Sequence, residues 1–118
     1  AEDNPRARLT PRDVRALQET RAFLDAEFAS APTIAFLARR VGMNRNKLTQ
    51  AFREIFDESI QSYCQRLCMH EARRLLESGL RVGEVAESVG YGHQSSFSQA
   101  FRDYFGVSPK DVRASSHR

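Results

Sequence analysis

Hydrophobic residues recur three and four positions apart along most of this 118-residue sequence, which places them on one face of an α-helix. Polar residues occupy the positions between them, as expected for helices that bury one side and expose the other. Glycines and short polar residues interrupt the pattern at intervals and separate the individual helices. The pattern predicts an all-α fold with seven helices and no strand.

Several of the interruptions contain a recognisable helix start. Thr10 is a good N-cap, Pro11 suits the first helical position, and Asp13 can bond back to the cap residue as in a capping box. Ser108-Pro109-Lys110-Asp111 repeats this chemistry later in the sequence. The helices are predicted at about residues 10–28, 33–41, 44–57, 59–78, 82–89, 94–105 and from 108 onwards.

Two pairs of these helices meet at a tight turn. Gly42 separates the second helix from the third, and Gly90 separates the fifth from the sixth, each offering a left-handed conformation at low cost. A small residue, Ala38 or Ala86, lies four positions before each glycine, where two helices that cross at a steep angle need space. Both pairs therefore predict a helix-turn-helix.

The two predicted motifs also resemble each other in sequence. LTQAFREIF, residues 48–56, matches FSQAFRDYF, residues 97–105, and the matched pattern covers about thirty residues in each copy. Only two copies exist, with a long helix between them, which excludes a solenoid. We therefore expect a linker or frayed segment at residues 1–9, a first subdomain at 10–57, a linker helix at 58–79 and a second subdomain at 80–118.

The second helix of a helix-turn-helix enters the DNA major groove, so its exposed face should be polar. Removing the inward-facing hydrophobic residues leaves such a face in both copies. The first face consists of Arg45, Asn46, Lys47, Thr49, Gln50 and Arg53, and the second of Gln94, Ser95, Ser96, Ser98, Gln99 and Arg102. One polar face is an ordinary solvated helix, but two faces in matched positions after matched turns favour DNA binding.

The side chains on these faces suit different parts of a DNA duplex. Gln50 and Gln99 offer the donor and acceptor pair that matches adenine. Arg45 or Arg53 can pair with guanine or hold a phosphate, and the residues alone do not separate these two roles.

Charge and composition narrow the class of protein further. Charged residues make up 28% of the sequence and hydrophobic residues 41%, as in soluble globular proteins. No segment approaches the length of a transmembrane helix and no secretory signal opens the sequence, so we expect a cytoplasmic protein without a membrane partner. The net charge of +3 is mild, but six acids precede residue 30 against five arginines, so the basic excess lies in the repeats.

Cys64 and Cys68 lie four positions apart and point the same way on the predicted linker helix. The simpler interpretation is two small buried hydrophobic residues in a reducing compartment. A zinc site would need two more ligands, and His70 lies on a different face of the helix. With Glu71, these residues provide no pair of base and nucleophile with a third orienting group. We therefore expect no catalytic residue, no metal site and no cofactor.

The segment VGYGHQSSFSQAFRDYFGVSPKDVR, which begins at Val89, is the most distinctive part of the sequence. Together with the two helix-turn-helix patterns, it resembles the AraC/XylS family of bacterial transcription regulators over residues 12–114. The resemblance implies two helix-turn-helix subdomains joined by a rigid helix, with recognition helices at about 44–57 and 94–105 in successive major grooves of DNA. A linker helix of about 30 Å agrees with grooves about 34 Å apart.

The resemblance also implies which residues contact DNA. Base contacts are expected from Asn46, Thr49, Gln50, Gln94, Ser95, Ser98 and Gln99, and phosphate contacts from Arg45, Lys47, Arg53, His93, Ser96 and Arg102. His93 departs from the family, many of whose members place Ser or Asp there as a helix cap, and a simple exposed turn residue is the alternative to a phosphate contact. The small serines of the second copy predict weaker base specificity there.

Partners follow from the same resemblance. The operator is expected to be double-stranded, asymmetric and divided into two half-sites about one helical turn apart. RNA polymerase is a second expected partner. The alternative to DNA binding is a protein-interaction module in which the same polar faces dock such a partner, and the two roles can coexist in an activator through different surfaces. Family members usually carry an N-terminal effector or dimerisation domain, and the linker-like residues 1–9 favour an excised domain over a small standalone regulator. The phrase GMNRNKLTQAF is similar to the branch that responds to iron-siderophore complexes.

Overall fold

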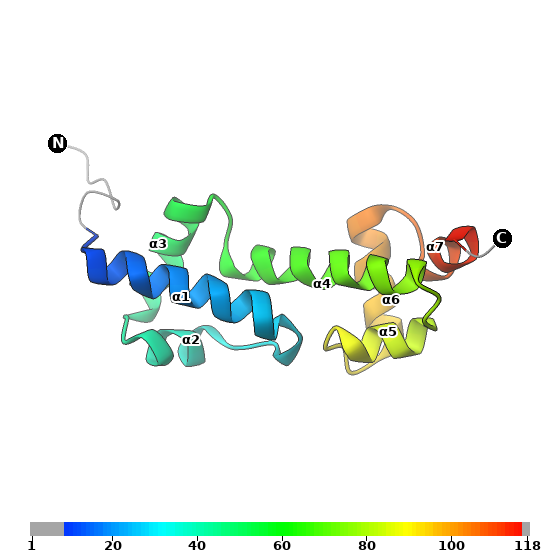
Figure 1. Ribbon diagram of the computed structural model, residues 1–118, viewed down its shortest axis with the longest axis horizontal. Coiled ribbons are helices and arrows are strands. Elements are labelled where there is room, and N and C mark those ends of the chain that lie inside the picture. The colour runs from blue at the N-terminus through cyan, green and yellow to red at the C-terminus, as the bar shows by residue number, and fades with distance from the viewer. Residues whose placement is uncertain (1–8, 117–118) are drawn as a thin grey trace. The chain divides into compact units, whose positions relative to one another are not determined.

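A computed structural model describes residues 9–116, which form seven α-helices, one short 3-10 turn and no strand (Figure 1). The all-α prediction is confirmed. The expected linker at residues 1–9 lies outside the described residues except for Leu9. The elements are α1 (Pro11–Glu27), η2 (Phe28–Ser30), α2 (Ile34–Val41), α3 (Arg45–Phe56), α4 (Ile60–Glu77), α5 (Val82–Ser88), α6 (Gln94–Phe105) and α7 (Pro109–Ser116).

Side-chain caps fix where the first helices begin. Thr10 Oγ1 accepts a hydrogen bond from the backbone N–H of Asp13 at 3.1 Å, and Oδ2 of Asp13 accepts one from the N–H of Thr10 at 3.1 Å. The predicted capping box is therefore confirmed. Thr33 Oγ1 accepts from the N–H of Phe36 at 3.1 Å and starts α2 in the same way.

The chain divides into two compact units, of which one ends at Cys64 and the other begins at Gln65, within α4. In the first unit α1 packs against α2 and α3. Burying one large hydrophobic side chain stabilises a fold by about 1.5–3 kcal/mol, so these contacts hold the unit together. Its core side chains are 0% exposed and come from all three helices: Leu17, Leu24, Leu37, Leu48 and Phe52.

In the second unit α5 packs against α6, and α6 against α7. Phe97 and Phe101 of α6 are 0% exposed, and their ring centroids lie 5.7 Å apart. The helical spacing of Phe97 and Phe101 continues to Tyr104 and predicts an inward side chain there, but that prediction is wrong, because Tyr104 is 41% exposed. Phe105 takes the place against Phe101, one helical turn away, with a centroid distance of 4.7 Å.

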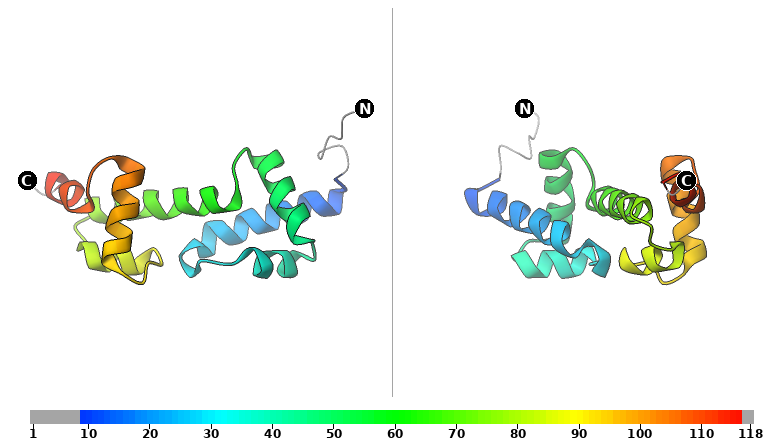
Figure 2. Two further views of the ribbon diagram at one scale, coloured as in Figure 1. Left: turned by 180° about the vertical axis from the view of Figure 1, so that it is seen from behind. Right: turned by 45° about the vertical axis from the view of Figure 1, so that its right-hand side comes forward.

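Both predicted helix-turn-helix motifs are present. In each motif the second helix stands steeply across the first, α3 across α2 and α6 across α5 (Figure 2). Gly42 and Gly90 adopt φ angles of 68° and 94° in the turns, a conformation that glycine reaches without a steric cost. Ala38 and Ala86 are 3% and 2% exposed, so the small residues are buried as the spacing predicted.

A single arginine connects α7 to the turn between α4 and α5. Arg113 Nε donates to the carbonyl oxygen of Leu80 at 3.1 Å, and Nη2 donates to the carbonyl oxygen of Gly79 at 3.2 Å. Gly79 and Leu80 follow the last residue of α4, Glu77. The guanidinium therefore binds carbonyl oxygens of the turn itself and ties α7 to it.

Candidate nucleic-acid interface

Asn44 fixes the first turn of α3. Its Oδ1 accepts hydrogen bonds from the backbone N–H of Asn46 at 2.8 Å and of Lys47 at 3.2 Å. Both N–H groups would otherwise lack a partner at the start of the helix. The cap leaves Arg45, Asn46 and Lys47 exposed, so predicted contact residues begin at the first residue of α3.

α3 has one buried and one exposed side. Leu48, Ala51 and Phe52 are buried. Thr49 Oγ1 donates to the carbonyl oxygen of Arg45 at 2.9 Å, so its hydroxyl oxygen can still accept a hydrogen bond. All predicted contact residues of this helix are exposed: Arg45, Asn46, Lys47, Thr49, Gln50 and Arg53.

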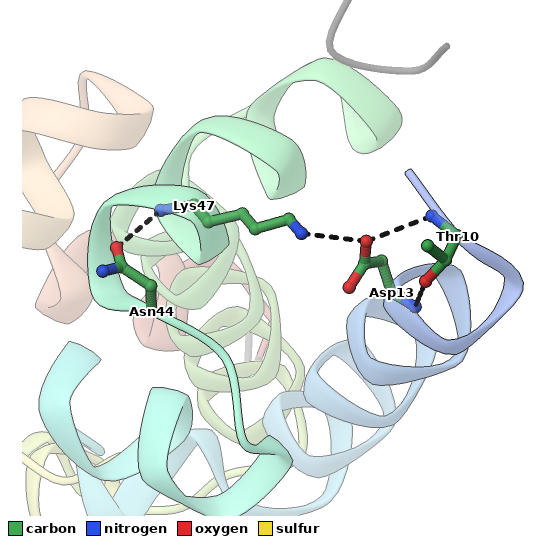
Figure 3. Close-up of polar contacts among 4 residues, drawn as sticks. All are labelled: Thr10, Asp13, Asn44 and Lys47. Carbon is green, nitrogen blue, oxygen red and sulfur yellow. Dashed lines mark hydrogen bonds and ion pairs between the residues drawn. The ribbon is translucent and has the colours of Figure 1, made fainter. Parts of the chain in front are cut away.

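Lys47 of this exposed side also reaches α1. Its Nζ lies 3.0 Å from Oδ2 of Asp13, the oxygen that accepts the capping-box hydrogen bond from Thr10 (Figure 3). The hydrogen bond from Thr10, and then the one from Lys47, hold the pKa of Asp13 below its usual range. Asp13 therefore remains ionised at neutral pH and balances one of the positive charges on α3.

α6 begins without a side-chain cap. His93 has the extended backbone of an N-cap residue, but its side chain makes no capping hydrogen bond, as the chemistry of imidazole suggested. Gln94 lies against α5, because a Cβ placed on Gly83 would stand 3.0 Å from Gln94 Oε1. Among the predicted contact residues of the second copy, Ser98 is half-buried and the others are exposed: His93, Gln94, Ser95, Ser96, Gln99 and Arg102.

Gln99 has a partner on its own helix. Its Nε2 donates to Oδ1 of Asp103 at 2.9 Å, one turn further along α6. This bond leaves the amide oxygen of Gln99 as an acceptor and one amide hydrogen as a donor. Arg102 lies in the last turn of α6, as Arg53 does in α3. The two helices thus carry polar residues at matching positions, but these residues have different local partners.

Comparison with known proteins identifies the arrangement. A family model described as a helix-turn-helix domain matches residues 37–115, from within α2 to within α7. The chain belongs to the AraC-type helix-turn-helix family. This AraC-type domain is a DNA-binding domain of the kind found in transcription regulators.

Individual relatives agree with the family. The HTH-type transcriptional regulator AlkR of Acinetobacter baylyi is 33% identical over 115 residues, which is 97% of this AraC-type chain and 38% of AlkR. The C-terminal domain of AraT, a response regulator from Geobacillus stearothermophilus, has a TM-score of 0.80 at 29% identity and covers 92% of this chain and 88% of that one. The DNA-binding domain of AdpA, whose structure contains a target DNA, has a TM-score of 0.78 at 27% identity, covering 85% of this chain and 91% of that one.

The AraC-type chain spans only part of its curated relatives. It covers 35% of the first of them, 38% of the second and 27% of the third. The likeness therefore concerns this domain and does not extend to the other parts of the longer regulators.

The cysteines and His70 of the AraC-type domain have packing contacts. Cys68 is buried and its Sγ donates to the carbonyl oxygen of Val89 at 3.5 Å, while burial raises the pKa of the Cys64 thiol. The His70 ring makes edge-on contacts with Tyr104 and Phe105. Residues 9–116 contain no group of three His, Cys, Asp or Glu side chains that could hold a metal ion. Nor does this described part contain a helix with the length and apolar character needed to cross a membrane.

Proposed function

We propose that this domain binds double-stranded DNA in a sequence-specific manner, with α3 and α6 as its recognition helices and without catalysing a reaction. One observation carries the proposal: two helices related by the QAFR repeat each expose a polar face directly after a matched glycine turn. The AdpA domain, which has a similar fold and a target DNA in its structure, supports DNA binding by analogy. Bacterial DNA lies in the cytoplasm, so we place the protein there.

Base reading is proposed for the amide and hydroxyl side chains of both faces. Gln50 has an exposed amide with a donor and an acceptor, which matches the major-groove edge of adenine. Gln99 can make the same pairing if its amide turns away from Asp103. The complete proposed set of base contacts is Asn46, Thr49 and Gln50 in α3, and Gln94, Ser95, Ser98 and Gln99 in α6.

Phosphate binding is proposed for the charged and peripheral side chains. Arg53 and Arg102 lie in the last turns of their helices, away from the proposed base contacts in the first turns, which suits contacts with the DNA backbone. Ser96 and His93 are exposed at the start of α6. The proposed set is Arg45, Arg53, His93, Ser96 and Arg102, together with Lys47 once its ammonium group is released from Asp13.

Two recognition helices in one chain favour an asymmetric operator. Because α3 and α6 differ in their exposed residues, we propose that they bind two different half-sites in successive major grooves, about one helical turn apart. Each of the two compact units carries one of these helices, which supports two separate half-sites.

Selection from a random pool of DNA duplexes tests the proposal. We expect enrichment of one asymmetric motif with two conserved blocks about one turn apart. Gln50→Ala should then weaken binding to the selected site by about 1–3 kcal/mol and relax the preference at one base position. Gln61→Ala, which removes an exposed amide from α4, is the matched control and should leave both quantities unchanged. Equal weakening on every duplex would exclude base reading by Gln50.

Two further partners are proposed for the full-length regulator. The matched residues make up only 35% and 38% of the first two relatives, which supports an additional N-terminal effector or dimerisation domain in the full-length regulator. RNA polymerase is the proposed protein partner, because the similar proteins are transcription regulators. Transcription in vitro from a template that carries the selected motif tests the second proposal, since the domain should change transcript yield only when the motif is present.

A further inference from the structure

Lys47 and Asp13 form an ion pair between the proposed recognition helix and the start of α1. Nζ of Lys47 lies 3.0 Å from Oδ2 of Asp13. Figure 3 shows the lysine side chain extended from the first turn of α3 toward the capping box, with its backbone N–H held by Asn44. Lys47 is therefore fixed at both ends, by Asn44 at the backbone and by Asp13 at the ammonium group.

The carboxylate of Asp13 is held more firmly than the ammonium group. The Asp13 side chain is 15% exposed, against 47% for Lys47. Oδ2 of Asp13 also accepts the N–H of Thr10 at 3.1 Å, which anchors the carboxylate to its own helix. The carboxylate is thus a fixed acceptor within α1, and Lys47 is the member of the pair that can change partner.

A second helix start in the chain shows what the ion pair adds. Ser108-Pro109-Lys110-Asp111 begins α7 as Thr10-Pro11-Arg12-Asp13 begins α1, and the N–H of Asp111 donates to Ser108 Oγ at 3.1 Å. Among residues 9–116, however, no lysine or arginine pairs with Asp111. Capping alone therefore accounts for an acid at this helix position, and the contact with Lys47 is an additional property of Asp13.

We propose that Asp13 is a positioning residue that holds the Lys47 ammonium group against α1 and so withholds one cationic contact from the DNA backbone. Because this contact is with phosphate, the effect is the same on every DNA sequence. The inference rests on the proposed DNA-binding function. A paired lysine and aspartate carry no net charge, so they release no counterions when DNA binds. Freed from Asp13, Lys47 would become the phosphate contact that its place in the first turn of α3 suggests.

The test measures binding of the 118-residue chain to the selected duplex and to a scrambled duplex as salt is raised from about 50 mM to about 200 mM. Asp13→Asn keeps an oxygen that can accept the Thr10 N–H, but it removes the charge. We expect the slope of log K against log salt to become steeper by about 0.9 on both duplexes, because one more phosphate is neutralised. Binding should then fall about 3.5-fold more than in the wild type over this range.

Three comparisons isolate the role of the ion pair. Asp111→Asn removes the same charge at the matched position of α7 and should leave the slope unchanged. Lys47→Gln should also leave the slope unchanged, because the proposal holds that Lys47 contacts no phosphate while Asp13 is present. The double variant with both Asp13→Asn and Lys47→Gln should therefore lose the additional slope of Asp13→Asn.

Each contrary result has a definite meaning. An unchanged slope in Asp13→Asn, an equal increase in Asp111→Asn, or a shallower slope in Lys47→Gln would overturn the inference. If Asp13→Asn does not fold, as seen by circular dichroism, Asp13→Gln, which also keeps an acceptor for the capping box, replaces it in the same measurement. A wild-type domain that shows no salt-sensitive binding to either duplex would instead contradict the proposed function itself.

Discussion

The two recognition helices have the same hydrophobic pattern but begin in different ways. α3 follows the side-chain cap of Asn44 and carries two cations, Arg45 and Lys47, in its first turn. α6 follows His93, which provides no side-chain cap, and its first turn is built from Gln94 and two uncharged serines. The first helix start is therefore charged and tied to its neighbours, whereas the second is neutral and less constrained.

This difference shows that packing and DNA-facing chemistry depend on separate residues of one helix. Phe52 and Phe101 occupy the same place in the two QAFR repeats, and both are 0% exposed. The exposed positions beside them differ in charge, size and hydrogen-bond partner. A duplicated scaffold can therefore keep one core pattern while each copy presents a different surface.

The largest expected effect comes from the shared core. Phe52→Ala and Phe101→Ala should each destabilise their own unit by about 3–5 kcal/mol, because each leaves a cavity among fully buried side chains. Amide hydrogen exchange followed by NMR would report the loss of protection in each unit separately.

The matched control for both phenylalanine variants is Phe36→Ala. Phe36 is 45% exposed and its main ring contact is with Phe23, at a centroid distance of 5.5 Å, so a loss of about 1 kcal/mol is expected. If Phe52→Ala and Phe101→Ala differed by several-fold, the two cores would not be equivalent despite their matched sequence.

An intermediate effect is expected from the caps, where the two units differ. Asn44→Ala should destabilise the first unit by about 1 kcal/mol, because two N–H groups at the start of α3 lose their acceptor. His93→Asn should stabilise the second unit by about 0.5–1 kcal/mol, because His93 already has the extended backbone of a cap residue. Thermal and urea unfolding of the two variants would measure both changes. A loss of stability in His93→Asn would show that the imidazole makes a contact that asparagine cannot replace.

The smallest effect is a pH dependence that belongs only to the first unit. The pKa of Asp13 is lowered from an ordinary value of 3.8, so the folded state favours the ionised carboxylate. The stability that this charge provides is fully present above pH 3.8 and is lost as the pH falls through the lower pKa of the folded state. The difference in thermal midpoint between the wild type and Asp13→Asn should therefore become smaller in acid. A constant difference from pH 7 to about pH 2.5 would contradict this pH dependence.

Local features of this fold could be predicted from the sequence. The caps at Thr10, Thr33 and Asn44 each join residues two or three positions apart, so their chemistry is visible in a short window. The glycine turns at Gly42 and Gly90 are visible for the same reason. The helix bounds follow from these signals together with the hydrophobic spacing.

Contacts between distant segments could not be predicted in this way. Lys47 and Asp13 each have a sufficient local explanation, a solvated helix and a capping box, so nothing in the sequence points to their contact. Ala31, which follows the short 3-10 turn after α1, has a left-handed φ of 50°. A glycine at this position would have indicated the turn, but an alanine gives no such signal. Tyr104 continues the spacing of Phe97 and Phe101, so the pattern alone places it inward, whereas packing brings its neighbour Phe105 against Phe101. The contact residues on α3 and α6 remain predictions, because their roles depend on DNA.

The contact made by Arg113 has a consequence for the order in which the chain folds on the ribosome. Arg113 lies 34 positions after Gly79, whose carbonyl oxygen it binds. Synthesis proceeds from the N-terminus, so α1, α2 and α3 can assemble as soon as they leave the exit tunnel. The second unit gains this contact only after α7 has emerged, when α5 and α6 are already available to pack against each other.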